Sequence, residues 1–205
     1  MGHLSACLVV ISLLQCIKQA QWPEVNPVIA FPGILQKDGS HHQYATKSVS
    51  ELLTISRDKL DHRLPKDVCP LECAVDTQFL RVWESLPRLK VEETQTSSNT
   101  LRVRVRRLNR GFTDRNMVYA PKFPKPQQES WFVIASDSSG KLLALQRLTM
   151  SGRESSVELD IPKDFTGESV TLRVLSDGWR GVDFEKPVAW KSVDGSEHSK
   201  KDISR

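Results

Sequence analysis

Residues 131–150 read WFVIASDSSGKLLALQRLTM, and this stretch decides the fold of the second half of the chain. It opens with five consecutive apolar residues, 131–135, a run typical of a strand buried on both faces. Asp137-Ser138-Ser139-Gly140 follows as a turn, so residues 142–150 are predicted to return as the hairpin partner.

Alternating apolar and polar residues flank this hairpin on both sides. Upstream, Leu101, Val103 and Val105 alternate with arginines. Downstream, residues 157–161 and 170–174 alternate in the same way, and a last strand is expected at residues 184–190. About six or seven short strands, separated by turn signals, indicate a β-sandwich.

The first half of the chain carries helical periodicity instead. Residues 4–21 are predicted to form a helix that is closed by Trp22 and stopped by Pro23, with one apolar face made of Leu4, Leu8, Ile11 and Leu14. A signal peptide is the alternative for this apolar run. A signal peptide requires a positively charged segment before its apolar run, and no Lys or Arg precedes this one. A buried helix is therefore favoured. The run is also too short to span a bilayer.

A second convincing helix is predicted for residues 71–86, where Phe79, Val82 and Leu86 recur at helical spacing and Pro87 follows. Between the two helices, residues 23–47 are rich in proline and glycine and are interpreted as a connector.

Two short helices are expected after this connector. Ser48 or Ser50 is a candidate N-cap for a helix that carries Val49, Leu52 and Leu53, and a further short helix is expected near residues 57–64.

These patterns predict an α+β multidomain chain, with a small helical segment followed by an all-β sandwich of fibronectin type III or immunoglobulin type. The polar stretch 92–100 has no periodicity and is interpreted as the boundary. The expected division is a helical part at 1–91, a sandwich at 92–191 and a disordered tail at 192–205.

Composition and cysteine placement favour a protein kept in a reducing compartment. Hydrophobic residues make up 39% of the chain and charged residues 26%, as expected of a folded protein. The net charge of +4 is only mildly basic. No cysteine follows Cys73 and no Asn-x-Ser/Thr sequon occurs, whereas secreted scaffolds distribute cysteines through their loops. The expected location is intracellular, cytoplasmic or nuclear.

No motif for catalysis or cofactor binding is present in the sequence. It contains no phosphate-binding G-x-x-x-x-G-K-[ST] loop, no H-E-x-x-H and no C-x-x-C. Cys69 and Cys73 are four residues apart, but His41, His42 and His62 lack finger-like spacing, so ordinary thiols are favoured over a zinc site. A cysteine nucleophile paired with a histidine stays an open alternative. We expect no catalytic residue, no metal and no cofactor.

One local feature could bind a partner. Arg102, Arg104 and Arg106 should project from one face of a strand, because side chains alternate along it, and Arg107, Arg110 and Arg115 follow. We name the first three the arginine ladder. It could contact RNA phosphate or an acidic partner. A solvated sheet face is the favoured interpretation, because no aromatic residues are interleaved for base stacking.

Three segments resemble a known domain family in their order and spacing. The first is Ala120-Pro121-Lys122-Phe123-Pro124-Lys125 with Glu129-Ser130-Trp131-Phe132, which is similar to the P-x-F-P-K…E-x-W passage of the Sec-sixty-three domain. Residues 142–148 resemble its L-(I/L)-A-(I/L)-K-R strand. Residues 171–177 followed by Gly181-x-Asp183 resemble its Y-T-L-Y-F-M-S-D…G-x-D signature.

The resemblance implies a non-catalytic accessory and protein-interaction module from the C-terminal end of a Ski-two-like RNA helicase. Such a module would brace or regulate the motor. The implied partners are the helicase core or complex subunits, with weak RNA binding at most and no membrane. A Sec-sixty-three-type module of an endoplasmic-reticulum translocation subunit is the alternative. That protein would also carry a J-domain His-Pro-Asp and long transmembrane runs, and this sequence has neither.

Overall fold

A computed structural model describes residues 3–35, 43–61, 73–109 and 116–191 of the 205-residue chain. The helical elements within these ranges are α1 (Leu4–Gln19), η1 (Pro27–Ala30), η2 (Gln43–Thr46), α2 (Val49–Thr54), α3 (Arg57–Asp61) and α4 (Cys73–Ser85). The strands are β1 (Leu89–Gln95), β2 (Thr100–Arg107), β3 (Met117–Val118), β4 (Gln127–Gln128), β5 (Ser130–Ser136), β6 (Leu142–Thr149), β7 (Glu154–Asp160), β8 (Ser169–Ser176) and β9 (Phe184–Ala189).

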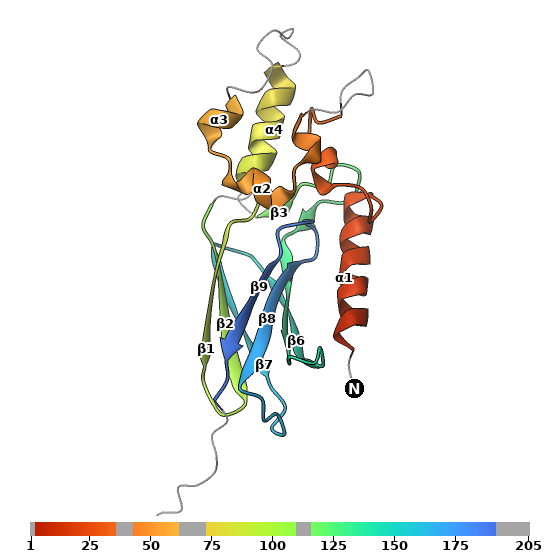
Figure 1. The fold of residues 1–205 in the computed structure, drawn as a ribbon. Helices are drawn as coiled ribbons and strands as arrows, with labels where there is room; N and C mark the ends of the chain where they lie inside the picture. The colour runs from red at the N-terminus through yellow and green to blue at the C-terminus, as the bar shows by residue number, and fades with distance from the viewer. Residues whose placement is uncertain (1–2, 36–42, 62–72, 110–115, 192–205) are drawn as a thin grey trace, which may run out of the picture.

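The β-rich half contains two antiparallel sheets. One sheet has the strand order β1-β2-β7 and the other has the order β6-β5-β8-β9, while β3 and β4 pair separately. The two sheets run together along the long axis of the molecule (Figure 1). Inward side chains of both sheets, such as Val103 from β2 and Val133 from β5, are fully buried in one hydrophobic core. The α+β class and the predicted hairpin are confirmed.

Strand β5 is buried on both faces, which explains its continuous apolar sequence. Trp131, Val133 and Ala135 belong to the main core. Ile134 lies on the opposite face, where it contacts a separate cluster made with helix α1. Trp131 is 0% exposed, as predicted from its place at the start of the most apolar run.

Helices α2, α3 and α4 cluster at one end of the sheets (Figure 1). The predicted face of α4 is confirmed, because Phe79, Val82 and Leu86 are buried. The ring of Tyr44 stacks on Phe79 with 5.9 Å between ring centroids. These side chains belong to the same core cluster as the inward residues of the sheets, so the helical end and the sheets share a continuous core.

Helix α1 lies along the side of the molecule (Figure 1), and its predicted buried face is confirmed at Leu4 and Ile11. The predicted end of the helix was wrong. The helix ends at Gln19, because Ala20 turns left-handed (φ 48°) and its N–H caps the carbonyls of Cys16 and Ile17. Trp22 therefore leaves the helix axis and is 77% exposed, so it does not close the segment as expected.

The expected cap of α2 is confirmed at Ser48. Its hydroxyl accepts from the Glu51 N–H at 3.1 Å, and the Glu51 carboxylate accepts from the Ser48 N–H at 2.6 Å, which forms a capping box. Helix α3 confirms the further short helix that was expected nearby.

Strand β1 was not predicted, because its polar sequence has no clear alternation. It pairs with β2 along its whole length, from Leu89 opposite Arg107 to Gln95 opposite Leu101. The division into 1–91 and 92–191 stays a prediction, although β1 begins at Leu89. The tail at 192–205 lies outside the described residues.

Candidate functional site

A buried ion pair lies where helix α4 meets the sheets. Arg107 ends strand β2 and follows the inward parity of Leu101, Val103 and Val105, so its side chain points into the protein. The side chain of Arg107 is 1% exposed and that of Glu129 is 0% exposed. Arg107 follows the arginine ladder directly in sequence, but this parity turns its side chain to the opposite face of the strand.

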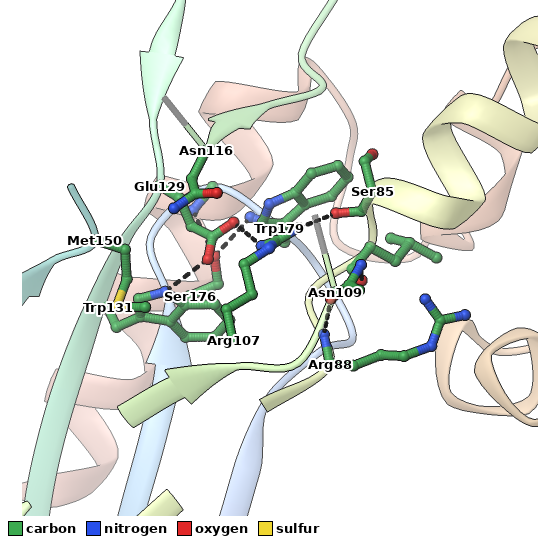
Figure 2. A network of polar contacts seen from close by, with 12 residues as sticks. Ser85, Arg88, Arg107, Asn109, Asn116, Glu129, Trp131, Met150, Ser176 and Trp179 are labelled. Atoms are coloured by element: carbon green, nitrogen blue, oxygen red, sulfur yellow. Dashed lines mark hydrogen bonds and ion pairs between the residues drawn. The ribbon is translucent and has the colours of Figure 1, made fainter. Parts of the chain in front are cut away.

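Figure 2 shows Arg107 reaching between Glu129 and Ser85. Its guanidinium forms an ion pair with one carboxylate oxygen of Glu129 and donates to the Ser85 carbonyl. The other carboxylate oxygen of Glu129 accepts from the indole N–H of Trp131 at 3.1 Å. We name these four residues the Arg107 network. A buried charge is tolerated only when it is paired and hydrogen-bonded in this way.

The Arg107 network ties the C-terminal end of α4 to the end of β2. The last carbonyls of a helix lack partners within the helix and carry partial negative charge. Here Arg107 satisfies the carbonyl of Ser85, and the side-chain amide of Asn109 satisfies those of Glu84 and Leu86. The Asn109 side chain also accepts from the Arg88 N–H at 3.0 Å. The helical end is therefore fixed to the three-stranded sheet by directional contacts as well as by packing.

Burial raises the pKa of Glu129, and the neighbouring guanidinium of Arg107 opposes that rise. The ion pair is thus the contact that favours the charged form of Glu129 in a site where burial disfavours it. Both side chains are enclosed by the core, and their paired charges join α4 to the sheets.

A second polar junction holds helix α1 against the turn at residues 176–183. The side chain of Gln15 donates to the Ser176 carbonyl at 2.6 Å, and that of Gln19 donates to the Gly178 carbonyl at 2.6 Å. Between them, Lys18 forms an ion pair with Asp177 at 2.8 Å. We name this set of contacts the α1 clasp.

The 176–183 turn contains the Asp177 and Gly181-x-Asp183 positions of the resemblance, and its glycines have physical reasons. Gly181 has φ +79°, and a Cβ there would lie 3.2 Å from Val49 of α2. A Cβ on Gly178 would lie 2.9 Å from a methyl carbon of Val118 in β3. The turn is therefore the place where α1, α2 and β3 approach the four-stranded sheet.

Asp183 faces the same junction. Its carboxylate accepts from the Ser176 N–H at 3.2 Å and from Gln15 at 3.5 Å. Desolvation raises the pKa of Asp183 to about 6, although the residue as a whole keeps substantial contact with solvent. Solvent therefore screens this carboxylate and limits its effect on stability.

The arginine ladder lies on the outward face of β2, as its alternation predicted. Arg102 forms an ion pair with Glu158 at 2.7 Å, and Arg104 lies 3.4 Å from Glu154. Arg106 stands in register with Glu154 on β7. Carboxylates thus flank the ladder on the neighbouring strands, which lowers the positive potential that a phosphate would meet. Whether the ladder contacts RNA or a partner stays a hypothesis.

The other sequence candidates fall on residues that the structure does not describe. His41, His42, His62, Cys69, Arg110 and Arg115 lie outside the described residues, and so does the side chain of Cys73. Within the described ranges, no three His, Cys, Asp or Glu side chains are grouped to hold a metal ion.

Sequence reasoning missed the residues that form the two junctions. The inward parity of Arg107 could have been read from the alternation of β2. The roles of Glu129 and Asp177 could not, because their partners are distant in sequence: Arg107 lies 22 residues from Glu129, and Lys18 lies 159 residues from Asp177.

Comparison with known proteins supplies the family. The Sec63 Brl domain family matches residues 1–189. The RQC trigger complex helicase SLH1 of Saccharomyces cerevisiae is 27% identical over 201 residues, which cover 86% of this chain and 10% of that protein. The human U5 small nuclear ribonucleoprotein 200 kDa helicase is 26% identical over 192 residues, which cover 90% of this chain and 9% of that protein.

The pre-mRNA-splicing factor brr2 of Schizosaccharomyces pombe is 26% identical over 200 residues, covering 90% of this chain and 9% of that protein. The chain thus spans about a tenth of the length of these relatives. Because the family match runs through both junctions and all of the described strands, the chain belongs to the Sec63 Brl domain family.

Proposed function

We propose that this chain is a non-catalytic accessory and protein-interaction module of a Ski-two-like RNA helicase, where it braces or regulates the motor. The observation that carries the proposal is the family match over residues 1–189, together with relatives that are named as helicases. Since the chain covers about a tenth of those relatives, we assign the ATP-driven motor to sequence outside it.

The geometry supports a bracing role. In the described part of the chain, the buried charges of Arg107, Glu129, Lys18 and Asp177 all serve to hold helices against sheets. A module that transmits force or orientation must keep its parts in fixed relation, and directional buried contacts do this better than packing alone. The core that the helical end shares with the sheets also keeps these parts in fixed relation.

For partners, we propose the helicase core or complex subunits, with RNA contributing weakly. The arginine ladder is opposed by carboxylates, and the net charge of +4 is small. The names of two relatives refer to the RQC trigger complex and to the U5 small nuclear ribonucleoprotein. We accordingly propose a cytoplasmic or nuclear location.

The translocation-subunit alternative is less favoured, because the relatives that match are named as helicases or as a splicing factor. Among the described helices, none is long and apolar enough to cross a membrane.

For the β-rich part we propose a fibronectin-like sandwich. The support is the pairing of a β1-β2-β7 sheet with a β6-β5-β8-β9 sheet around one core. We keep the division into a helical part at 1–91 and a sandwich at 92–191 as part of this proposal. An experimental structure whose sheets had another strand order would contradict it.

The proposed function can be tested with the ATPase cassette of a Ski-two-like helicase from which its own Sec63 unit has been removed. The purified chain should hydrolyse no ATP with or without RNA, because it lacks a phosphate-binding loop. Titrated into the cassette, it should bind measurably and change RNA-stimulated ATP turnover. The triple Arg102/Arg104/Arg106→Gln variant serves as the matched control for binding through the ladder. Turnover by the chain alone, or no binding and no change in the cassette, would contradict the proposal.

A further inference from the structure

Helix α1 is attached to the protein differently from the other helices. The buried apolar side chains described in α2, α3 and α4 join the main core. The buried aliphatic residues of α1, Leu4 and Ile11, belong to a separate cluster, in which they meet Ile134 on the outer face of the four-stranded sheet. Moving α1 away would therefore leave the core between the two sheets closed.

Cys7 and Leu8 of α1 also pack against this cluster, but the outward side of the helix does not contribute to it. Its outward face carries four large apolar side chains that are 54–67% exposed: Val9, Val10, Leu13 and Ile17. Since hydrophobic stabilisation scales with the apolar area removed from water, the small inner cluster is the hydrophobic hold on α1.

Polar contacts supply the rest of the attachment, and they have a strict register. Gln15, Lys18 and Gln19 stand at helical positions i, i+3 and i+4, which share one face. They meet three consecutive residues of the turn, Ser176, Asp177 and Gly178. Helix α1 is thus docked in one position by the α1 clasp.

Asp177 is the central residue of the clasp. One of its carboxylate oxygens is shared by Lys18 at 2.8 Å and Arg147 of β6 at 2.7 Å. Its other oxygen is buried without a partner among the described residues. When α1 moves away, water can reach this carboxylate, which offsets part of the contacts that are lost. The clasp is therefore a contact that can open at modest cost and close again in register.

We propose that α1 is a strap that opens from the four-stranded sheet as a unit while the two-sheet core stays folded, and that the Lys18–Asp177 ion pair sets how often it opens. Opening uncovers an apolar patch on the sheet made of Phe132, Ile134, Leu142 and Leu175. This behaviour is local unfolding of one cooperative unit with few apolar contacts.

Cys16 provides a native probe of opening. It lies in α1 and is 4% exposed in the closed position. In a background with Cys7, Cys69 and Cys73 changed to Ser, the rate of Cys16 labelling by a thiol reagent reports how often α1 opens. Hydrogen exchange at the amides of Val133 and Val174, in the two central strands of the four-stranded sheet, reports opening of the core.

Lys18→Met keeps the length of the side chain and removes its charge. It should accelerate Cys16 labelling at least about tenfold, because breaking a buried ion pair costs more than a factor of ten in an equilibrium. Exchange at Val133 and Val174 should be nearly unchanged. Lys90→Met is the matched control, since Lys90 pairs with Glu92 at the surface. It should leave labelling within about a factor of two.

Two results would overturn the proposal. One is equal labelling in Lys18→Met and Lys90→Met. The other is Cys16 labelling in the unaltered helix that is as slow, and as denaturant-dependent, as exchange at Val133. If Lys18→Met does not fold, Arg147→Met replaces it, because it removes the more exposed cation from the same oxygen. That variant should accelerate labelling by a smaller factor, and unchanged labelling would count against the strap.

Discussion

Strand β2 carries arginines on both of its faces. Those on the outward face are exposed to solvent, whereas the one on the inward face is buried. Arg102 and Arg104 lie outward with side chains 52% exposed, and their ion pairs are half in water. Arg107 lies inward at 1% exposure, and its carboxylate partner is fully buried. Whether an arginine of β2 lies on the outward or the inward face therefore decides whether its ion pair is solvated or buried.

The difference teaches that the number of arginines on a strand says little about their role. Exposed ion pairs contribute about 0–1 kcal/mol, because water and salt screen them. Removing one partner of a buried pair costs about 3–5 kcal/mol, because the other charge is left uncompensated. In this chain the inward arginine joins α4 to the sheets, and the outward arginines keep an exposed sheet face charged.

The largest expected effect is that of Arg107→Met. It should lower the free energy of unfolding by about 3–5 kcal/mol for the broken pair, and the unsatisfied Ser85 carbonyl adds about 1–3 kcal/mol. Arg104→Met is the matched control and should cost less than about 1 kcal/mol. Chemical denaturation of both variants measures the contrast. Equal losses of unfolding free energy in the two variants would show that the face on which an arginine lies does not decide how much its ion pair stabilises the protein.

The loss in Arg107→Met should also depend on pH. Without Arg107, the opposition to the raised pKa of Glu129 is gone, so the folded state favours a protonated Glu129 more strongly. A carboxyl group whose pKa is higher in the folded than in the unfolded state stabilises the folded protein at low pH. That stabilisation is lost as pH rises through the folded-state pKa. The variant should therefore regain part of its stability on acidification from neutral pH, relative to the parent chain.

Trp131→Ala should cost about 3–5 kcal/mol, as other large-to-small aromatic changes in cores do. The change empties a fully buried site and removes the indole donor to Glu129. Thermal unfolding is the measurement. Stability close to that of the parent chain would show that Trp131 is not the core residue of β5.

The predictability of the fold and of the site differed for physical reasons. Alternation along β2 and the apolar run of β5 predicted strands, because local periodicity reports which faces are buried. Strand β1 was missed, since its polar residues on an edge strand leave no such pattern. The end of α1 was missed because a left-handed Ala20, rather than Pro23, stops the helix.

The junctions could be predicted only in part. The parity of Arg107 was available in the sequence, whereas the contact of Lys18 with Asp177 depends on how α1 packs across the four-stranded sheet. Pairing at such sequence separation is a property of the tertiary fold and leaves no local signal.

The change of Arg102, Arg104 and Arg106 together to Gln should leave stability within about 1 kcal/mol, as exposed changes usually do. RNA binding should be weak before and after the change, because carboxylates flank the ladder. Fluorescence titration in low salt measures it. Tight binding abolished by the triple change, with a salt slope shallower by roughly one unit for each lost contact, would make the ladder a phosphate-binding surface.

The smallest expected effect concerns Asp183, whose folded pKa is raised to about 6. Its contribution to stability is fully present below the ordinary pKa of an aspartate and is lost as pH rises through about 6. Because the residue is exposed to solvent, we expect less than about 1 kcal/mol. Asp183→Asn should remove this slope, which unfolding between acidic and neutral pH measures. An unchanged slope would assign it to another group.

Native-state hydrogen exchange on Arg107→Met tests most directly whether the inward arginine joins the helical end to the sheets. Amides in α4 and at the end of β2 should lose protection together, and by similar factors, because Arg107 satisfies the end of the helix from the strand. Arg104→Met should leave both segments protected. Undiminished protection of α4 in Arg107→Met, or loss confined to β2, would contradict the account.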